Sequence, residues 1–251
     1  SGVPAVNAAR AAFGLASIVT LADQHLAAER LLLGTSRAFD FAPDTLPAHI
    51  RYVGPQPDDP AWAAPWHSPW PAEDRRPLVL VAFSTSFQDH VGVLQRIIDA
   101  AETLPVRVLV TLGDTVLPDE LRPGENCRLV HSAPHNRVMP EAALIITHGG
   151  HGTVVRSLAH RKPLLIVPHG RDQNDNAARV VARGAGLALP ASACVSAFRN
   201  AIADLLDDPR HALGAERLGQ RVAEEMDGSP VVEELEALAA RPRCSDSLKA
   251  A

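Results

Sequence analysis

Short apolar runs that alternate with amphipathic stretches dominate the chain after Pro77. The first run, LVLVAF at residues 78–83, is continuously apolar, which is typical of a strand buried on both faces. The stretch that follows it, VGVLQRIIDAAETL, has its apolar residues at helical spacing. The later runs are VRVLVTL, CRLVH, ALIIT, PLLIVP and GLAL, and helix patterns begin near Pro134, Thr153, Asn174 and Ser196. This alternation predicts an α/β domain with a Rossmann-like, mostly parallel sheet and helices on both faces.

The residues before this domain follow a different pattern. Residues 15–33 are predicted to form a helix, and AFDF (38–41) and IRYVGP (50–55) are predicted to form short strands. Between residues 55 and 77, seven prolines exclude regular structure, and the tryptophans Trp62, Trp66 and Trp70 offer large apolar surfaces. We interpret these tryptophans as pins that hold a crossover segment on a domain; the alternative is a role at a cleft or partner surface.

Four segments follow from these patterns. They are an amino-terminal remnant (1–54), a Pro/Trp-rich linker (55–77), an α/β domain (78–240) and a tail (241–251) that is expected to be disordered. Residues 201–206 and 213–238 are predicted to be amphipathic helices.

The composition excludes several classes of protein. The formal net charge is -5 and no basic stripe is present, so nucleic acid is not an expected partner. Three widely spaced cysteines, none in a C-x-x-C pair, argue against a disulfide framework or a cysteine zinc site. Charged residues interrupt the Ala- and Leu-rich start, so neither a signal peptide nor a membrane span is predicted, and we expect a cytoplasmic protein.

The motif THGGHGT, residues 147–153, lies where a predicted strand passes into a helix predicted to run from Thr153 to His160. Ligands of parallel α/β sheets bind at this edge, and glycines there let backbone N–H groups and a helix N-terminus approach an anion. His148 can add a ring N–H, and Thr153 can cap the helix. The alternative is a tight turn whose histidines are only solvated.

A metal site is a weaker interpretation of the same histidines. His148 and His151 are three residues apart, and His131 and His135 lie upstream. No HExxH pattern is present and no carboxylate lies nearby in sequence, so no metal and no cofactor are predicted.

Asp172 and Gln173 lie between the next predicted strand and its helix. A carboxylate beside an amide can bind two neighbouring hydroxyls of a sugar ring. The alternative is that Asp172 or Asn174 caps the helix.

The ordered set PHNRVMPEAALIITHGGHGTVVRSLAHRKPLLIVPHGRDQNDNAARV strongly resembles the donor-binding region of GT-B glycosyltransferases that use nucleotide sugars. These include plant UDP-sugar enzymes and actinobacterial natural-product glycosyltransferases. The resemblance extends over residues 78–238, and residues 38–56 resemble the end of that family's amino-terminal domain and its linker. It also implies that the last helices pack back on residues 15–33.

The resemblance implies a role for each matching residue. The residues implied to bind the diphosphate are His148, Gly150, Gly152, Thr153, Ser84 and Thr85. Asp172 and Gln173 match the pair that holds hydroxyls of the donated sugar. Ala133, His135 and Asn136 match a segment next to the base and ribose.

The implied activity is inverting transfer of a sugar from a UDP- or dTDP-sugar to a small-molecule, natural-product acceptor. Two departures qualify it. Arg156 stands where plant relatives have a glutamate for the ribose hydroxyls, so the ribose contact does not carry over. The acceptor pocket and the general base belong to a region not matched here, and His25 lies in a helical pattern as a surface residue. The chain alone is therefore expected to be inactive, with no catalytic residue of its own.

Two other interpretations stay open: a stand-alone, non-catalytic nucleotide-binding or interaction module, and a related GT-B sugar-nucleotide epimerase. The epimerase is disfavoured because the further acidic and basic residues that it needs are not found.

Overall fold

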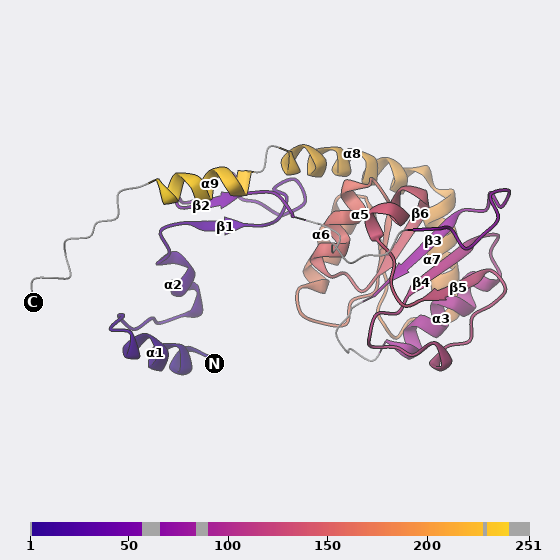
Figure 1. Ribbon diagram of the computed structural model, residues 1–251, viewed down its shortest axis with the longest axis horizontal. Coiled ribbons are helices and arrows are strands. Elements are labelled where there is room, and N and C mark those ends of the chain that lie inside the picture. The colour runs from indigo at the N-terminus through magenta and orange to yellow at the C-terminus, as the bar shows by residue number, and fades with distance from the viewer. Residues whose placement is uncertain (1, 57–65, 84–89, 228–229, 241–251) are drawn as a thin grey trace, which may run out of the picture.

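The predicted parallel sheet is present in the computed structural model, which describes residues 2–56, 66–83, 90–227 and 230–240 (Figure 1). Six parallel strands are hydrogen-bonded in the order β5-β4-β3-β6-β7-β8. Their bounds are β3 Leu78–Ala82, β4 Arg107–Thr111, β5 Cys127–Val130, β6 Ala142–Thr147, β7 Leu164–Ile166 and β8 Gly186–Ala188. The α/β prediction, with a mostly parallel sheet, is confirmed.

Helices cover both faces of this sheet. They are α3 Val91–Glu102, α4 His135–Val138, α5 His151–Ala159, α6 Gln173–Ala182, α7 Val195–Asp207 and α8 Pro209–Met226, with short 3-10 turns η1 Pro118–Glu120 and η2 Met139–Glu141. Alternate strand residues enter different cores: Val79 and Val81 pack with α3 and α7, whereas Leu78 and Leu80 pack on the opposite face with Met139. A third cluster joins β7 to α5, α6 and α8. The central strands β3, β6 and β7 are buried on both faces, and their sequences are therefore nearly continuously apolar.

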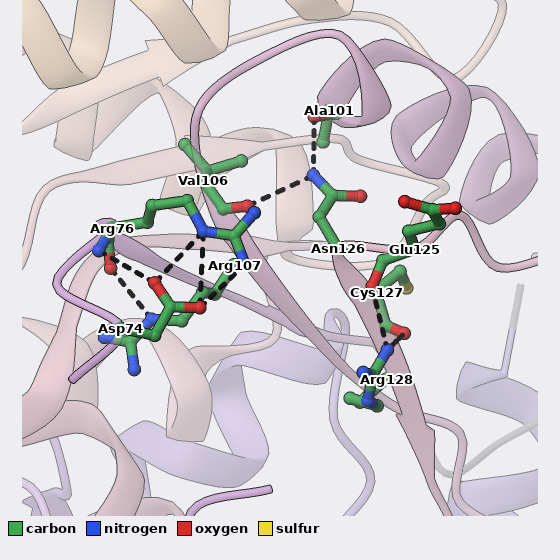
Figure 2. Close-up of polar contacts among 9 residues, drawn as sticks. All are labelled: Asp74, Arg76, Ala101, Val106, Arg107, Glu125, Asn126, Cys127 and Arg128. Carbon is green, nitrogen blue, oxygen red and sulfur yellow. Dashed lines mark hydrogen bonds and ion pairs between the residues drawn. The ribbon is translucent and has the colours of Figure 1, made fainter. Parts of the chain in front are cut away.

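Polar contacts fasten the amino-terminal edge of the sheet (Figure 2). Arg76 donates to the Asp74 carboxylate over 2.7–3.3 Å, and Arg107 Nε donates to the carbonyl of Arg76 at 2.8 Å. The buried Asn126 donates from Nδ2 to the carbonyls of Ala101 and Val106, at 3.0 and 3.1 Å. These bonds join the end of the linker to β4, and the end of α3 to the start of β5.

Two of the linker tryptophans do pin this segment to the domain. Trp70 is buried in the cluster that contains Leu78 and Met139, with the Arg107 guanidinium 5.6 Å from its ring centroid. Trp66 packs against the same cluster and donates from Nε1 to Glu141 at 3.0 Å. Trp62 lies outside the described residues.

The predicted helix over residues 15–33 is wrong. The chain instead forms α1 Val3–Ala12, α2 Leu21–Leu26 and the strand β1 Leu31–Leu33. Thr20 starts α2 afresh, because its side chain and that of Asp23 form a reciprocal capping box. Leu31–Leu33 is a strand because it pairs in parallel with β2 Ile50–Tyr52, a long-range contact that overrides the helix propensity of leucine.

The strand predicted over residues 38–41 is also wrong. Ser36 starts a turn there, since its carbonyl accepts from the amide of Asp40 at 3.0 Å and its hydroxyl from the amide of Phe39 at 3.2 Å. Ala38 and Phe39 are consecutive and both buried, a pattern that no half-buried strand gives.

This turn attaches the amino-terminal segment to the α/β domain. Phe39 packs in the cluster formed by β7, α5, α6 and α8. The Asp40 carboxylate accepts from Arg179 Nε on α6 at 2.7 Å and from the hydroxyl of Tyr52 at 2.7 Å. Burial favours the neutral form of Asp40, but these two donors outweigh it and the pKa of the carboxyl is lowered. Glu225 on α8 accepts the backbone amide of Arg37 at 2.6 Å.

The last helix, α9 Pro230–Ala239, lies beside β1 and β2 (Figure 1). Its Glu234 pairs with Arg30 at 3.1 Å and with Arg51 at 3.5 Å, so the end of the chain does cross back to the amino-terminal segment. In the described ranges, no helix is both long and apolar enough to cross a membrane. The tail predicted to be disordered, 241–251, lies outside them.

We predict that Asp40→Ala lowers the free energy of unfolding by about 1–3 kcal/mol, because Arg179 and Tyr52 both lose a partly buried partner. Because the pKa of Asp40 is lowered, this loss is present at neutral pH and vanishes as the carboxyl is protonated below pH ~3.9. Urea unfolding across this pH range measures it. Asp44→Ala, at an exposed position of the same segment, is the control and changes stability by less than about 0.5 kcal/mol; equal effects of the two changes would contradict the attachment.

Candidate functional site

The strand order reverses between β3 and β6. From β3 the chain continues to β4 on one side, whereas β6 continues to β7 on the other. The loops that leave the carboxyl ends of β3 and β6 therefore run in opposite directions, and such a switch point is where ligands bind in open α/β sheets. Ala82 is in register with Thr147, so Phe83 and His148 both follow directly at this edge.

The helix after β6 begins two residues earlier than predicted. Gly150, with φ -60° and ψ 133°, is the N-cap and His151 is the first helical residue. Thr153 is therefore inside the first turn and is not the cap, because the extended backbone of Gly150 already breaks the strand from the helix. Among the described residues no side chain caps α5. Its first-turn amides consequently offer hydrogen bonds to an anion.

The three glycines of the motif differ in how much space surrounds them and in backbone conformation. Gly149 has φ +96°, and a Cβ there would lie 2.7 Å from Ile166 Cγ2. A Cβ on Gly150 would lie 2.6 Å from Nε2 of His148, so this glycine makes room for the imidazole. A Cβ on Gly152 would meet no described atom within 4 Å. The open space beside α5 is therefore at Gly152, whereas Gly149 is required by the turn itself.

His148 is a buried imidazole at the carboxyl end of β6. Its exposed fraction is 8%, and Nδ1 lies 3.4 Å from the hydroxyl of Thr147. Burial lowers the pKa of His148 to about 4, and the nearby His169 lowers it further. The charge of Asp172 and a hydrogen bond with the backbone of Ala82 oppose this shift. At neutral pH the ring is therefore uncharged, with one N–H to donate and one nitrogen to accept.

Two more histidines and a phenylalanine join His148, and the sequence alone did not indicate them. His90 is the N-cap of α3 and is 2% exposed, and His169 follows β7. Phe83, directly after β3, lies 5.1–6.0 Å from the three imidazole centroids. Each of these residues stands just after a strand or just before a helix, which was the only signal for them.

His151 points to the amino-terminal segment instead. Its Nε2 lies 2.7 Å from the hydroxyl of Thr35, and its ring is 6.3 Å from that of Phe39. Burial lowers the pKa of His151. In the part of the chain that the structure describes, the histidines of the motif form no metal-ligand group; the one group of that kind is Asp204, Asp208 and His211 at the junction of α7 and α8.

Asp172 and Gln173 lie together at the start of α6, but their side chains differ. Asp172 is exposed, makes no side-chain cap, and accepts from Asn176 Nδ2 at 2.9 Å. Gln173 is 2% exposed, and its Oε1 accepts the backbone amides of His169 at 2.7 Å and Gly170 at 3.2 Å. Gln173 thus shapes the loop after β7, while Asp172 presents a carboxylate to solvent.

Three of the remaining predicted residues lie just after β5, in or next to α4. Ala133 packs against the core beneath β5, and His135 and Asn136 open α4. Asn136 Oδ1 lies 3.3 Å from Nε2 of His160, which joins α4 to the end of α5. Arg156 is half-buried on α5. Ser84 and Thr85 lie outside the described residues.

A family model and a curated relative both match most of the α/β domain. The family model of the erythromycin biosynthesis protein CIII-like, C-terminal domain, matches residues 95–238. The 4'-demethylrebeccamycin synthase of Lentzea aerocolonigenes is 33% identical over 198 residues, which cover 76% of this chain and 46% of that protein. This chain thus spans about half the length of that relative.

Solved structures share the fold. The crystal structure of the calicheamicin glycosyltransferase CalG4 superimposes with a TM-score of 0.77 at 22% identity, covering 96% of this chain and 59% of that one. The glycosyltransferase VinC, in complex with dTDP, gives a TM-score of 0.60 at 25% identity, covering 82% of this chain and 51% of its own.

We predict that alanine substitutions at Gly149 and Gly152 have opposite effects on stability. Gly149→Ala should lower the free energy of unfolding by about 1–3 kcal/mol from its positive φ alone, with a further loss from the contact with Ile166. Gly152→Ala, in the first turn of α5 with open space around it, should raise it by about 0.5–1 kcal/mol. Thermal unfolding of the two variants checks this, and a destabilised Gly152→Ala would mean that the turn is built differently.

Proposed function

The chain belongs to the family of the erythromycin biosynthesis protein CIII-like C-terminal domain, whose relatives are natural-product glycosyltransferases, and from that membership we propose that it is a donor-binding part of such an enzyme. It binds a nucleoside diphosphate sugar for transfer to a small-molecule acceptor. The observation that carries the proposal is the uncapped N-terminus of α5 beside the buried His148, at the switch point of the sheet.

The diphosphate binds at this point in the proposal. The first-turn amides of α5 and the partial positive charge of the helix end attract the anion, and Gly152 leaves room for it. His148 donates a ring N–H to a phosphate oxygen, and Thr153 offers its hydroxyl from the first turn. Ser84 and Thr85 are proposed to approach the same phosphates. Because helix and imidazole both act on the diphosphate, the proposal requires no metal ion there.

The sugar and the nucleoside lie on either side of the diphosphate. The exposed carboxylate of Asp172 is the group proposed to accept hydrogen bonds from sugar hydroxyls. Gln173 supports it indirectly, since its buried oxygen already binds two backbone amides. Ala133, His135 and Asn136 are the proposed neighbours of the base and ribose. Arg156 replaces the glutamate that holds the ribose hydroxyls in plant relatives, which is easier to reconcile with a deoxyribose. Together with the dTDP complex of VinC, this makes dTDP the first nucleotide to test, with UDP as the second.

The proposed chemistry is a displacement with inversion. An acceptor hydroxyl forms a new C–O bond at the anomeric carbon as the bond from that carbon to the diphosphate breaks, and a general base takes the hydroxyl proton. Negative charge then develops on the β-phosphate, where His148 and the α5 amides stabilise it. The chain spans about half of its relative, and we propose that the base and the acceptor pocket come from a region outside it. By itself the chain then binds donor without transferring sugar.

We predict that this chain binds dTDP or UDP in the presence of EDTA and that His148→Ala weakens the binding by about 1.5–3 kcal/mol. The loss corresponds to one hydrogen bond to a charged phosphate. Isothermal titration calorimetry measures it. His211→Ala, at the junction of α7 and α8, is the control and should leave the affinity unchanged. If neither nucleotide binds, or if His148→Ala binds as tightly as the wild type, the proposed site is incorrect.

The Gly152→Ala variant distinguishes an effect on nucleotide affinity from an effect on stability. A methyl group at this position should strengthen α5 but occupy space proposed for a phosphate, so we expect about tenfold weaker nucleotide binding despite a higher unfolding temperature. Calorimetric titration and thermal unfolding of the same preparation provide the two measurements. A more stable variant with unchanged affinity would place the diphosphate elsewhere on the edge.

A further inference from the structure

Three histidines from three different strand–helix connections lie close together at the candidate anion site. His90 precedes α3, His148 follows β6 and His169 follows β7. The ring centroids of His90 and His169 are 4.6 Å apart with the planes at 80°, and those of His90 and His148 are 6.0 Å apart at 40°. Phe83 packs against all three rings. We call these three histidines the imidazole cluster.

The cluster has an incomplete set of hydrogen bonds. Nδ1 of His169 lies 2.8 Å from the carbonyl oxygen of Val167, so Nδ1 carries a hydrogen and donates it to that carbonyl. His90 Nε2 is buried, and none of the described residues provides a hydrogen-bond partner for it. A buried polar atom without a partner is costly, and such atoms in folded proteins call for an explanation. His90 takes no part in the proposed contacts with the diphosphate.

Two of the three imidazoles, His90 and His148, lack positive charge of their own. Burial lowers the pKa of His90 to about 4, with further lowering by His169 and His148. The pKa of His148 is lowered to a similar value by burial, by His169 and by Arg171, against the opposing charge of Asp172. Three imidazoles this close disfavour any second charge among themselves. Without a ligand, both His90 and His148 are therefore neutral at pH 7.

We infer that the imidazole cluster takes up a proton when a diphosphate binds at the α5 N-terminus, with His90 as a positioning residue for the two rings nearer the ligand. The inference rests on the proposed function, since it adds a proton to the same anion site. The proton comes from solvent and is carried by His148 or His169 next to the anion. His90 holds both rings and offers the unpartnered Nε2 as an acceptor for the protonated neighbour.

The size of the effect follows from electrostatics. An opposite charge within a few ångströms raises an imidazole pKa by about 1–3 units. A rise of about 2 units, from about 4, leaves the ring half protonated at pH 6, so about half a proton is taken up per diphosphate. Linkage then requires the association constant to increase about threefold for each unit by which the pH falls near 6.

The experiment is calorimetric titration of the whole chain at pH 6 in two buffers of different ionisation enthalpy, with inorganic pyrophosphate and with dTDP. The difference in apparent enthalpy between the buffers gives the number of protons bound. A terminal phosphate of either probe also titrates near pH 6, so the uptake by the cluster is measured as the difference from His90→Phe. We expect the wild type and His211→Phe, a variant in α8, to bind up to about half a proton more than His90→Phe. His90→Phe keeps a ring but no nitrogen, and should bind the same probes with clearly reduced uptake. His90→Gln, which keeps an acceptor, should recover part of it.

The outcomes separate this inference from the proposed function. Equal proton uptake by the wild type and His90→Phe overturns the role of the cluster. If pyrophosphate binds with proton uptake but neither nucleotide binds, the role of the cluster is supported and the nucleotide site is rejected. If neither probe binds, both are rejected. If His90→Phe fails to fold, the histidine Cε1–H resonances of the wild type can be titrated by NMR with and without pyrophosphate. The inference requires that pyrophosphate raise the pKa of His148 or His169.

Discussion

The parallel pairing of β3 with β6 is the constraint on which the rest of this structure depends. These two strands are consecutive in the sheet but are separated in the chain by β4 and β5, so the order of the sheet reverses between them. Their register sets Ala82 opposite Thr147, and the residues that follow, Phe83 and His148, are brought to the same point of the carboxyl edge. Since the strands are parallel, each helix that follows a strand starts at that edge, so the starts of α3, α5 and α6 gather there as well.

The N-terminus of α5 and the imidazoles at this edge are suited to reversible binding of an anion. The N-cap of α5 is a glycine without a side-chain acceptor, so the helix end keeps its donors for a ligand. His90 and His148 are buried and neutral, which avoids positive charges repelling one another when no anion is present. In the proposed function, such a site would gain charge only with a negative ligand bound, at the place where negative charge develops on the departing diphosphate.

The amino-terminal segment is coupled to this edge through α6 and the glycine turn. Asp40 accepts from Arg179 on the helix that begins with Gln173, and Thr35 contacts His151 in the first turn of α5. Phe39 fills the core between these helices. At the far end, Glu234 of α9 pairs with Arg30 and Arg51, so the chain closes on the segment from which it started. The segment is thus attached to the last turn of α6 and to the first turn of α5.

The sequence alone predicted the α/β class, the strands from Leu78 onward, the anchoring by Trp66 and Trp70, and the motif around His148. These features are local: a strand buried on both faces must be continuously apolar, and glycines with histidines after it mark a turn. The sequence did not determine β1, the turn at Ser36, the start of α5 at His151, or the approach of His90 and His169 to His148. Each of these depends on partners distant in the chain or on backbone geometry. Leu31–Leu33 is a strand only because Ile50–Tyr52 lies beside it, and three imidazoles meet only because the strand order brings three separate loops to one edge.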